Sequence, residues 1–493
     1  MSAPQLLIQQ DPHRTRVALL EEGRLVELFL ERRRDRGVVG NLYKGRVNRV
    51  LPGMEAAFVD IGLERDAFLH VDDLRDRSSG SGAEDETQEG PGEAEKAIDD
   101  LLKPGEEIVV QVVKDPVPSK GARVTPRITL PGRYLVFVPD GAHLGVSRRI
   151  EDPEERERLR EIVAGLPEGG WIVRTAGEGE RPESFERDAG SLRSRWDRIR
   201  DRIREAGAPA LVHEDLDVAL RVVRDRFGPG FEALRVEGEE IHRRVSEFLQ
   251  EVDPSLARKV RRHEGRRPLF EVADVEEEIE AALRSKVWLR SGGYLVIQPT
   301  EALVAIDVNT GRFVGSEDLE RTILRTNLEA VREAVRQIRL RNLGGIVVLD
   351  LIDMEEAESR EEVFAALEEE VRKDRARSRV LSISEFGLVE MTRKRSRPSL
   401  QRLLTSPCPY CQGDGRVKAL TTIAMELREE VLDHGAPRGA RELMLRAHPD
   451  LANALRGEEK AVVEELERTL GLSIVVRSDP ELHRERFEVL EVR

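Results

Sequence analysis

The sequence predicts a multidomain protein of the α/β class, and three observations lead to this expectation. The chain has 493 residues, which corresponds to roughly three folding units at about 150 residues each. Short β-type runs broken by glycine fill the N-terminal region, and helical stretches alternate with strongly apolar strands further on. Such alternation is typical of an α/β core.

The N-terminal region predicts a hairpin followed by a small barrel. Apolar runs at 16–20 and 25–29 flank the turn residues 21–23, which favours a hairpin. Further β-type runs at regular spacing, typical of a barrel, lie at 41–47, 56–61, 67–71 and 107–113. Residues 75–95 interrupt them with an acidic, Gly- and Ser-containing tract without large apolar side chains. We expect a disordered loop inserted in the barrel.

The rest of the chain alternates helices and strands, with a separate small domain expected from residue 420. Predicted strands lie at 134–138, 171–174, 218–223, 294–297, 302–306 and 346–352. Predicted helices, identified by apolar residues at helical spacing, lie at 191–205, 238–252, 275–289 and 316–341.

Composition sets limits on function. Charged residues make up 35%, hydrophobic residues 39% and aromatic residues 4%, and the net charge is −15. An acidic mean argues against a nucleic-acid partner unless basic residues gather locally. Two cysteines exclude a disulfide-stapled secreted scaffold. Since no apolar run approaches the length of a membrane span and no basic region precedes an apolar run at the start, we expect a soluble cytoplasmic protein without a membrane segment.

Two predicted strands end in acidic residues. Asp307 and Asn309 belong to an Asp-x-Asn-x-Gly sequence, and Asp350 lies within the later apolar run 346–352. We expect these carboxylates to be buried, which is costly unless they are paired or bound to a metal. Together they would offer hard oxygen ligands for magnesium. The alternative is that they are turn residues, which Asp and Asn often are.

The segment 372–402 carries ten basic and three acidic side chains, a local net charge of +7. Charge runs are usually solvated faces. Because this one follows the candidate metal strand, we favour a role in neutralising a phosphate backbone.

Cys408 and Cys411 lie in a Cys-x-x-Cys knuckle followed by Gly413 and Gly415. One chain therefore offers half of a tetrahedral zinc site, and a second copy would complete it across a two-fold axis. The rival interpretation is a redox dithiol, which usually opens a helix in a thioredoxin-like context. The glycine-rich loop favours zinc.

Phe58 and Phe68 lie in predicted barrel strands near the basic residues Lys44, Arg46 and Arg49. Aromatics exposed beside cations form the stacking platform of single-strand-binding OB folds, whereas buried core phenylalanines are the alternative.

Arginines and small donors also occur at two later predicted strand ends. The sequences 147–149 (Ser-Arg-Arg) and 173–177 (Val-Arg-Thr-Ala-Gly) offer groups suited to a terminal phosphate.

Seven blocks, in order along the chain, resemble the bacterial ribonuclease E/G family. They lie at 40–47, 51–62, 130–136, 173–177, 300–311, 344–354 and in the cysteine knuckle. The resemblance covers essentially the whole chain. It is strongest to the ribonuclease G branch, because the chain stops shortly after the small C-terminal domain.

The resemblance implies specific residue roles. It assigns Asp307 and Asp350 as magnesium ligands and Asn309 as an assisting catalytic amide. Its RNA-binding residues are Phe58, Phe68 and Lys120. Its sensor for a 5′-monophosphate consists of Gly132, Val136, Arg148, Arg174 and Thr175. Its shared zinc ligands are Cys408 and Cys411.

The resemblance also implies an architecture. The expected parts are an RNase H-like subdomain (1–38 and 214–280), an OB-fold barrel (39–127), a 5′ sensor (128–213), a DNase I-like catalytic subdomain (281–401), a zinc link (402–416) and a small α/β domain (417–493).

The implied activity is magnesium-dependent hydrolysis of single-stranded A/U-rich RNA to 5′-phosphate and 3′-hydroxyl ends, stimulated by a 5′-monophosphate, in rRNA maturation and mRNA decay. The implied assembly is a homodimer through shared zinc, with a tetramer left open. Our mechanistic hypothesis is metal-assisted attack of water on the scissile phosphate. The rival is a non-catalytic OB-fold RNA-binding or ribosome-associated factor, and a thiol oxidoreductase is a third possibility.

Overall fold

The computed structural model confirms a multidomain α/β protein. It describes residues 3–75, 97–117, 119–311, 319–384, 387–395, 397–435 and 442–492. The chain forms two compact units, Met1–Leu400 and Gln401–Arg493. Apart from residue 75, the predicted insertion at 75–95 lies outside the described residues. No helix in the described ranges is long and apolar enough to cross a membrane.

The first sheet joins the N-terminal hairpin to a later part of the chain, in the order β15-β14-β1-β2-β3. Its strands are β1 (Gln5–Gln10), β2 (Arg14–Glu21), β3 (Arg24–Arg32), β14 (Ala233–Glu237) and β15 (Val260–Arg262). The helices that share its core are α5 (Val218–Arg226), α6 (Glu239–Val252) and α7 (Pro254–Ala257). Glu22 and Gly23 have φ angles of 52° and 76°, as a two-residue primed turn requires. The predicted hairpin is confirmed.

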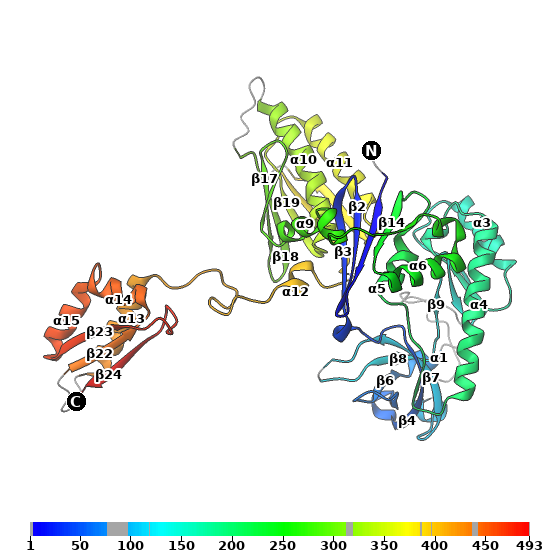
Figure 1. The fold of residues 1–493 in the computed structure, drawn as a ribbon, viewed down its shortest axis with the longest axis horizontal. Coiled ribbons are helices and arrows are strands. Elements are labelled where there is room, and N and C mark those ends of the chain that lie inside the picture. The colour runs from blue at the N-terminus through cyan, green and yellow to red at the C-terminus, as the bar shows by residue number, and fades with distance from the viewer. Residues whose placement is uncertain are drawn as a thin grey trace. The chain divides into compact units, whose positions relative to one another are not determined.

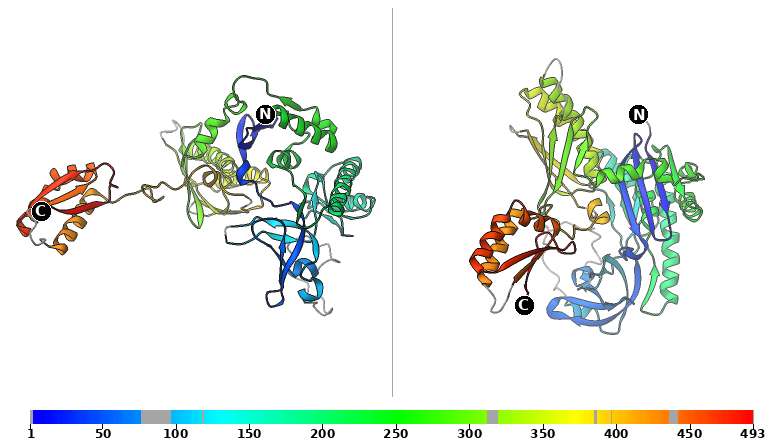
Figure 2. Two further views of the ribbon diagram at one scale, coloured as in Figure 1. Left: turned by 60° about the horizontal axis from the view of Figure 1, so that its bottom comes forward. Right: turned by 60° about the vertical axis from the view of Figure 1, so that its left-hand side comes forward.

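Five strands close into a barrel, which is consistent with an OB fold (Figure 2). They are β4 (Leu42–Leu51), β5 (Ala56–Asp60), β6 (Ala67–His70), β7 (Glu107–Lys114) and β8 (Arg123–Thr125). Pairing of β7 with β4 closes the wall, and β13 (Ala210–His213) adds to the edge of β4. The short helices α1 (Asp72–Arg75) and α2 (Ile98–Leu101) flank the barrel sequence.

A third, four-stranded sheet has the order β11-β12-β10-β9. Its strands are β9 (Leu130–Pro131), β10 (Leu135–Val138), β11 (Leu144–Val146) and β12 (Gly170–Val173), and its helices are α3 (Pro153–Ala164) and α4 (Pro182–Glu205). Helix α4 begins nine residues before the predicted start at 191. Pro182 suits its first turn, and Phe185 and Ala189 are buried on its apolar stripe.

The fourth sheet has six strands in the order β16-β17-β18-β19-β21-β20. They are β16 (Lys286–Trp288), β17 (Tyr294–Pro299), β18 (Leu303–Asn309), β19 (Gly345–Asp350), β20 (Ser378–Ile383) and β21 (Leu388–Arg393). The short helices α8 (Leu269–Val272) and α9 (Val275–Ala282) precede it. Helices α10 (Leu319–Leu340) and α11 (Ala357–Arg372) lie side by side along one face (Figure 1). Along β18, buried residues alternate with exposed or half-buried ones, so the other face is open.

The second unit contains a three-stranded sheet in the order β23-β22-β24. Its elements are α13 (Leu420–His434), β22 (Glu442–Ala447), α14 (Pro449–Arg456), α15 (Lys460–Leu470), β23 (Ser473–Ser478) and β24 (Phe487–Val492). Helix α12 (Leu400–Leu404) spans the division between the units. From residue 420 this unit alternates helices and strands, as the sequence predicts.

Two sequence predictions are wrong at the level of local structure. The segment 218–223, predicted as a strand, forms α5. The Asp217 side chain caps this helix by accepting a 3.0 Å hydrogen bond from the Leu220 N–H, and burial on the first sheet outweighs the β-branched propensity. The helix predicted over 275–289 ends at Ala282, and residues 286–288 form the edge strand β16 instead.

Candidate active site

Two carboxylates meet on the open face of the six-stranded sheet. Asp307 on β18 and Asp350 on β19 are direct register partners in a parallel pair, so both side chains leave the same face. The expectation that they are buried is wrong, because both are exposed. The pleat buries their neighbours Ile306 and Leu349 instead. Partial desolvation and the negative charges of Asp307 and Asp353 raise the pKa of Asp350.

Asn309 braces the carboxylate of Asp307. Its Nδ2 donates a 2.8 Å hydrogen bond to Oδ2 of Asp307, and the two residues share a face because they are two apart on one strand. The glycine of the motif serves the turn that follows: Gly311 has a φ of 63°. A Cβ atom there would lie 2.4 Å from the carbonyl oxygen of Gly292, so the Asp-x-Asn-x-Gly spacing combines side-chain chemistry with a backbone requirement.

Sequence reasoning missed a buried amide that supports this site. Asn327 of α10 is fully buried. Its Nδ2 donates a 2.8 Å hydrogen bond to the carbonyl oxygen of Ile352, and its Oδ1 accepts a 3.1 Å bond from the N–H of the same residue. The pair fixes the backbone two residues beyond Asp350. The available signal was a polar residue on the apolar stripe between Ile323 and Ala330.

The donor set of Asp307 and Asp350 fits magnesium. Mg²⁺ is usually held by one or two carboxylates, while waters and substrate phosphates complete the octahedron. The repulsion that contributes to the raised pKa of Asp350 is the electrostatic condition that a divalent cation relieves. In the part of the chain that the structure describes, no three His, Cys, Asp or Glu side chains gather as a metal site.

The barrel carries an aromatic pair. Phe58 and Phe68 are direct partners across β5 and β6, with ring centroids 6.0 Å apart in an edge-on arrangement, and both are half-buried. Arg49 is the cross-strand partner of Phe58. Lys120 is exposed in the loop before β8, the strand that pairs with β6.

Two basic residues that the sequence placed near this pair are engaged elsewhere. Nζ of Lys44 lies 3.0 Å from the Glu107 carboxylate and donates a 2.8 Å hydrogen bond to the carbonyl oxygen of Ala206. Arg46 is 3.2 Å from the same carboxylate. These two cations join barrel strands to the segment before β13. Of the three basic residues named from the sequence, Arg49 is the one that lies beside the rings, and Arg123 is the cross-strand partner of Phe68.

Arg174, immediately after β12, is held by two groups. Its Nη1 donates to the carbonyl oxygen of Gly132, and its Nη2 lies 2.8 Å from Oδ1 of Asp225.

The buried Asp188 carboxylate accepts hydrogen bonds of 2.8–3.2 Å from three consecutive backbone N–H groups at the start of β10. A Cβ atom at position 132 would lie 2.6 Å from both oxygens of Asp188, which explains the glycine.

The other predicted sensor residues border the same strand ends. The Thr175 hydroxyl is 3.0 Å from the hydroxyl of Ser147, and Arg148 is exposed next to it in sequence. Val136 is half-buried on β10. The parallel pairing of β11 with β12 brings the two segments together, and the structure thus gathers Arg174, Thr175 and the segment 147–148 at one edge of the sheet.

Two basic side chains of the segment 372–402 pack within the fold, and a phosphate-binding role for the exposed ones stays a prediction. Buried Arg393 lies 2.6 Å from Asp374. The guanidinium of Arg397 lies 3.9 Å from the ring centroid of Phe29. Exposed side chains of this segment that show neither an ion pair nor a side-chain hydrogen bond among the described residues are Arg377, Arg379 and Lys394.

The cysteine knuckle precedes α13. Cys408 and Cys411 are free thiols, and the N–H of Gly415 donates a 3.3 Å hydrogen bond to Sγ of Cys411. Hydrogen bonds from backbone N–H groups, led by that of Cys411, lower the pKa of the Cys408 thiol. The Tyr410 ring stacks on His483 at 4.1 Å between centroids, which anchors the loop to its unit. Two thiolates fit half of a tetrahedral zinc site.

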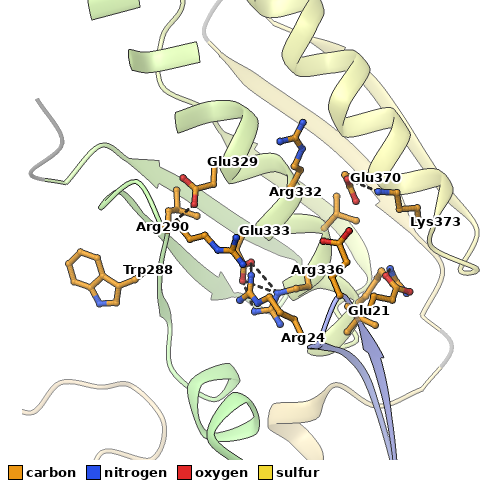
Figure 3. Close-up of a pocket in the computed structure, with 15 residues that line it drawn as sticks. Glu21, Arg24, Trp288, Arg290, Glu329, Arg332, Glu333, Arg336, Glu370 and Lys373 are labelled. Atoms are coloured by element: carbon orange, nitrogen blue, oxygen red, sulfur yellow. Dashed lines mark hydrogen bonds and ion pairs between the residues drawn. The ribbon is translucent and has the colours of Figure 1, made fainter. Parts of the chain in front are cut away.

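A charged cavity of about 970 Å³ lies between the N-terminal hairpin and α10. Figure 3 shows the side chains that line it. Arg24 and Arg336 each lie 2.7 Å from the Glu333 carboxylate, and Arg336 also reaches Glu278 of α9 at 2.8 Å. These pairs join the first sheet to the helices of the six-stranded sheet. Trp288 lies at the rim and points away from them (Figure 3).

Comparisons with known proteins agree along nearly the whole chain. Residues 129–396 match the model of the Ribonuclease E/G family, and residues 407–492 match the model "RNase E/G, Thioredoxin-like domain". Ribonuclease G of Escherichia coli strain K12 is 42% identical over 488 residues, 99% of each chain. Ribonuclease G of Haemophilus influenzae is 41% identical over 493 residues, 99% of this chain and all of the relative. Ribonuclease E of Escherichia coli is 34% identical over 484 residues, 97% of this chain but 45% of the relative.

Proposed function

The chain belongs to the ribonuclease E/G family and is more similar to the ribonuclease G relatives than to ribonuclease E, and from this we propose that it is a magnesium-dependent endoribonuclease. Its substrate is single-stranded, A/U-rich RNA, and its products carry 5′-phosphate and 3′-hydroxyl ends. Its place is in rRNA maturation and mRNA decay. The observation that carries the proposal is the exposed pair Asp307 and Asp350, matched in register on adjacent strands.

In this proposal the chain holds the scissile phosphate on the open sheet face. Asp307 and Asp350 hold the magnesium ion, and Asn309 orients Asp307 through its 2.8 Å hydrogen bond. When bound, the ion supplies Lewis-acid polarisation of the phosphate and lowers the pKa of a water molecule. On the barrel, Phe58 and Phe68, with Lys120, grip the single strand by stacking and charge.

The test is cleavage of a 5′-monophosphorylated, A/U-rich oligonucleotide by the full chain with magnesium or with EDTA. Asp307→Asn and Asp350→Asn keep the shape and remove one negative charge each, so we expect each to reduce kcat at least 100-fold. Glu390→Gln, which changes an exposed carboxylate on the same sheet, is the matched control and retains activity. RNA binding without magnesium-dependent cleavage in the unmodified chain would instead identify a non-catalytic RNA-binding factor.

We further propose that the 5′-monophosphate is sensed by Arg174 and Thr175 with Gly132, Val136 and Arg148. Arg174 is already oriented by the Asp225 carboxylate 2.8 Å away, so a phosphate would add a second anion to a preordered guanidinium. Arg174→Ala should slow cleavage of monophosphorylated RNA and spare triphosphorylated RNA. Equal slowing of both substrates would exclude a sensor role.

The cysteine knuckle is proposed as half of a zinc site shared by two chains. Metal analysis of the full chain should give half a mole of zinc per chain, and light scattering should give a dimer, whether or not dimers pair further. Cys408→Ser should remove both the zinc and the dimer. A monomer that keeps one zinc per chain would contradict the shared site.

A further inference from the structure

An aromatic pair lies on the same face of the six-stranded sheet as the carboxylates. Trp288 on β16 is the direct partner of Tyr294 on β17, and Tyr294 is the direct partner of Asn309 on β18. Cross-strand partners share a face, so the three side chains form one row. The next row runs through Lys286 and Val296 to Asp307. Two strand spacings, about 10 Å, separate Trp288 from Asn309.

The pair faces solvent and contacts a lysine. Trp288 is 65% exposed, the largest exposed fraction of any large apolar side chain in the described ranges. The Trp288 and Tyr294 ring centroids are 5.3 Å apart in an edge-on arrangement. Nζ of Lys286 lies 4.1 Å from the centroid of Trp288 and 3.5 Å from that of Tyr294. The cation contact favours this position of the indole, while most of the ring stays in water.

We propose that Trp288 and Tyr294, held by Lys286, form a stacking site for a nucleobase adjacent to the scissile phosphate. This inference rests on the proposed endoribonuclease activity. The occupant follows from the chemistry of the site: an exposed indole offers a π face to a flat ring, and the ammonium of Lys286 complements a backbone phosphate. The indole and the carboxylate pair lie on the same face of the sheet. An RNA strand that crosses the carboxylate pair along this row therefore passes the indole.

The site differs in role from the barrel pair Phe58 and Phe68. It lies in the catalytic sheet itself, so stacking there would set the path of the nucleotides next to the cut. Stacking accepts any base, because every base has a π face. The site would thus position the strand without reading its sequence.

Binding to RNA with one abasic nucleotide tests the proposal. The full chain with Asp307→Asn binds a labelled single-stranded oligonucleotide without cutting it, and the abasic position is moved along the sequence. We expect one position, next to the mapped cleavage site, to lower affinity roughly 5- to 150-fold. Adding Trp288→Ala should lower affinity for intact RNA by the same factor and make binding insensitive to that position. Trp288→Phe should restore both.

Ile346→Ala is the matched control, since Ile346 is 51% exposed and lies four residues before Asp350 on the same face of β19. It should keep the sensitivity of the parent chain. Equal abasic profiles with and without Trp288 would overturn the inference. Unchanged RNA affinity together with altered oligomer mass in the Trp288→Ala chain would also overturn it and identify a self-association surface. Cleavage by the unmodified chain is scored separately, so loss of the proposed activity and loss of the stacking site give different results.

Discussion

The substitution Gly132→Ala tests how the candidate sensor is built. The new Cβ atom would lie 2.6 Å from both carboxylate oxygens of Asp188 and 2.8 Å from its Cγ. Non-bonded carbon and oxygen atoms stay more than about 3 Å apart. The carboxylate must therefore move by about half an ångström or more. Asp188 is 2% exposed and has no solvent to move into.

The cost follows from the bonds that this movement breaks. The Asp188 carboxylate accepts three backbone N–H bonds, at 2.8, 2.9 and 3.2 Å. Hydrogen bonds to charged groups contribute about 1.5–3 kcal/mol each. Loss of two gives an expected destabilisation of about 3–6 kcal/mol. The carbonyl of Gly132 that orients Arg174 would shift with it.

Urea unfolding of the full chain measures this destabilisation, and the ratio of cleavage rates on monophosphorylated and triphosphorylated RNA measures the sensor. We expect the ratio to approach one. The matched control is Gly190→Ala, two residues after Asp188 in α4, where a Cβ atom meets nothing within 4 Å. It should stabilise the chain by about 0.5–1 kcal/mol. If Gly132→Ala lowered the free energy of unfolding by less than about 1 kcal/mol, the proposed clash with Asp188 would be refuted.

Two further predictions concern a buried amide and a half-buried histidine. Asn327→Leu removes both hydrogen bonds to Ile352. Urea unfolding should show that the free energy of unfolding falls by about 2–4 kcal/mol. Because the backbone after β19 is no longer held, kcat should also fall. Burial and the charge of Arg195 lower the pKa of His213 to about 4. Since an unfolded histidine titrates near 6.5, the folded state binds fewer protons between these values, and stability falls as pH drops. Urea unfolding at pH 7 and pH 5 should differ by about 2 kcal/mol from this group alone, a difference that His213→Gln removes.

The sequence indicated that the two acidic residues end strands, but it did not indicate that both are exposed. The sequence alone places two carboxylates at the ends of apolar strands. In an open α/β sheet such strand ends line one edge of the sheet, where sites form. The apolar run around Asp350 suggested a strand buried on both faces. Helices α10 and α11 pack on one face, and this one-sided arrangement depends on contacts far apart in the sequence. The pleat then turns Asp350 outwards.

Prediction from the sequence also failed for elements that are too short to show a hydrophobic periodicity. Residues 286–288 form a three-residue edge strand, and its apolar Trp288 fits the helical spacing of the preceding segment equally well. Only pairing with β17 makes it a strand. Asn327 shows the complementary case: its helix was predicted, but the backbone atoms it binds belong to a loop 25 residues away.

The salt dependence of RNA binding follows from how the basic residues are used. A net charge of +7 over 372–402 would suggest many phosphate contacts, yet Arg393 is buried against Asp374 at 2.6 Å. Arg379 and Lys394 are exposed and pair with no carboxylate of the described residues. Each phosphate contact to single-stranded RNA contributes about 0.7 to the slope of log K against log salt.

We therefore expect Arg379→Gln and Lys394→Gln each to reduce that slope by about 0.7, without loss of stability. Arg393→Gln should instead cost about 3–5 kcal/mol of stability, because it leaves the Asp374 charge buried and unpaired. Binding titrations from 50 to 300 mM salt, paired with urea unfolding, separate the two effects. If Arg393→Gln lowered the slope in a chain of normal stability, the buried cations of this segment would also contact phosphates, and the division between buried structural and exposed RNA-binding cations would be wrong.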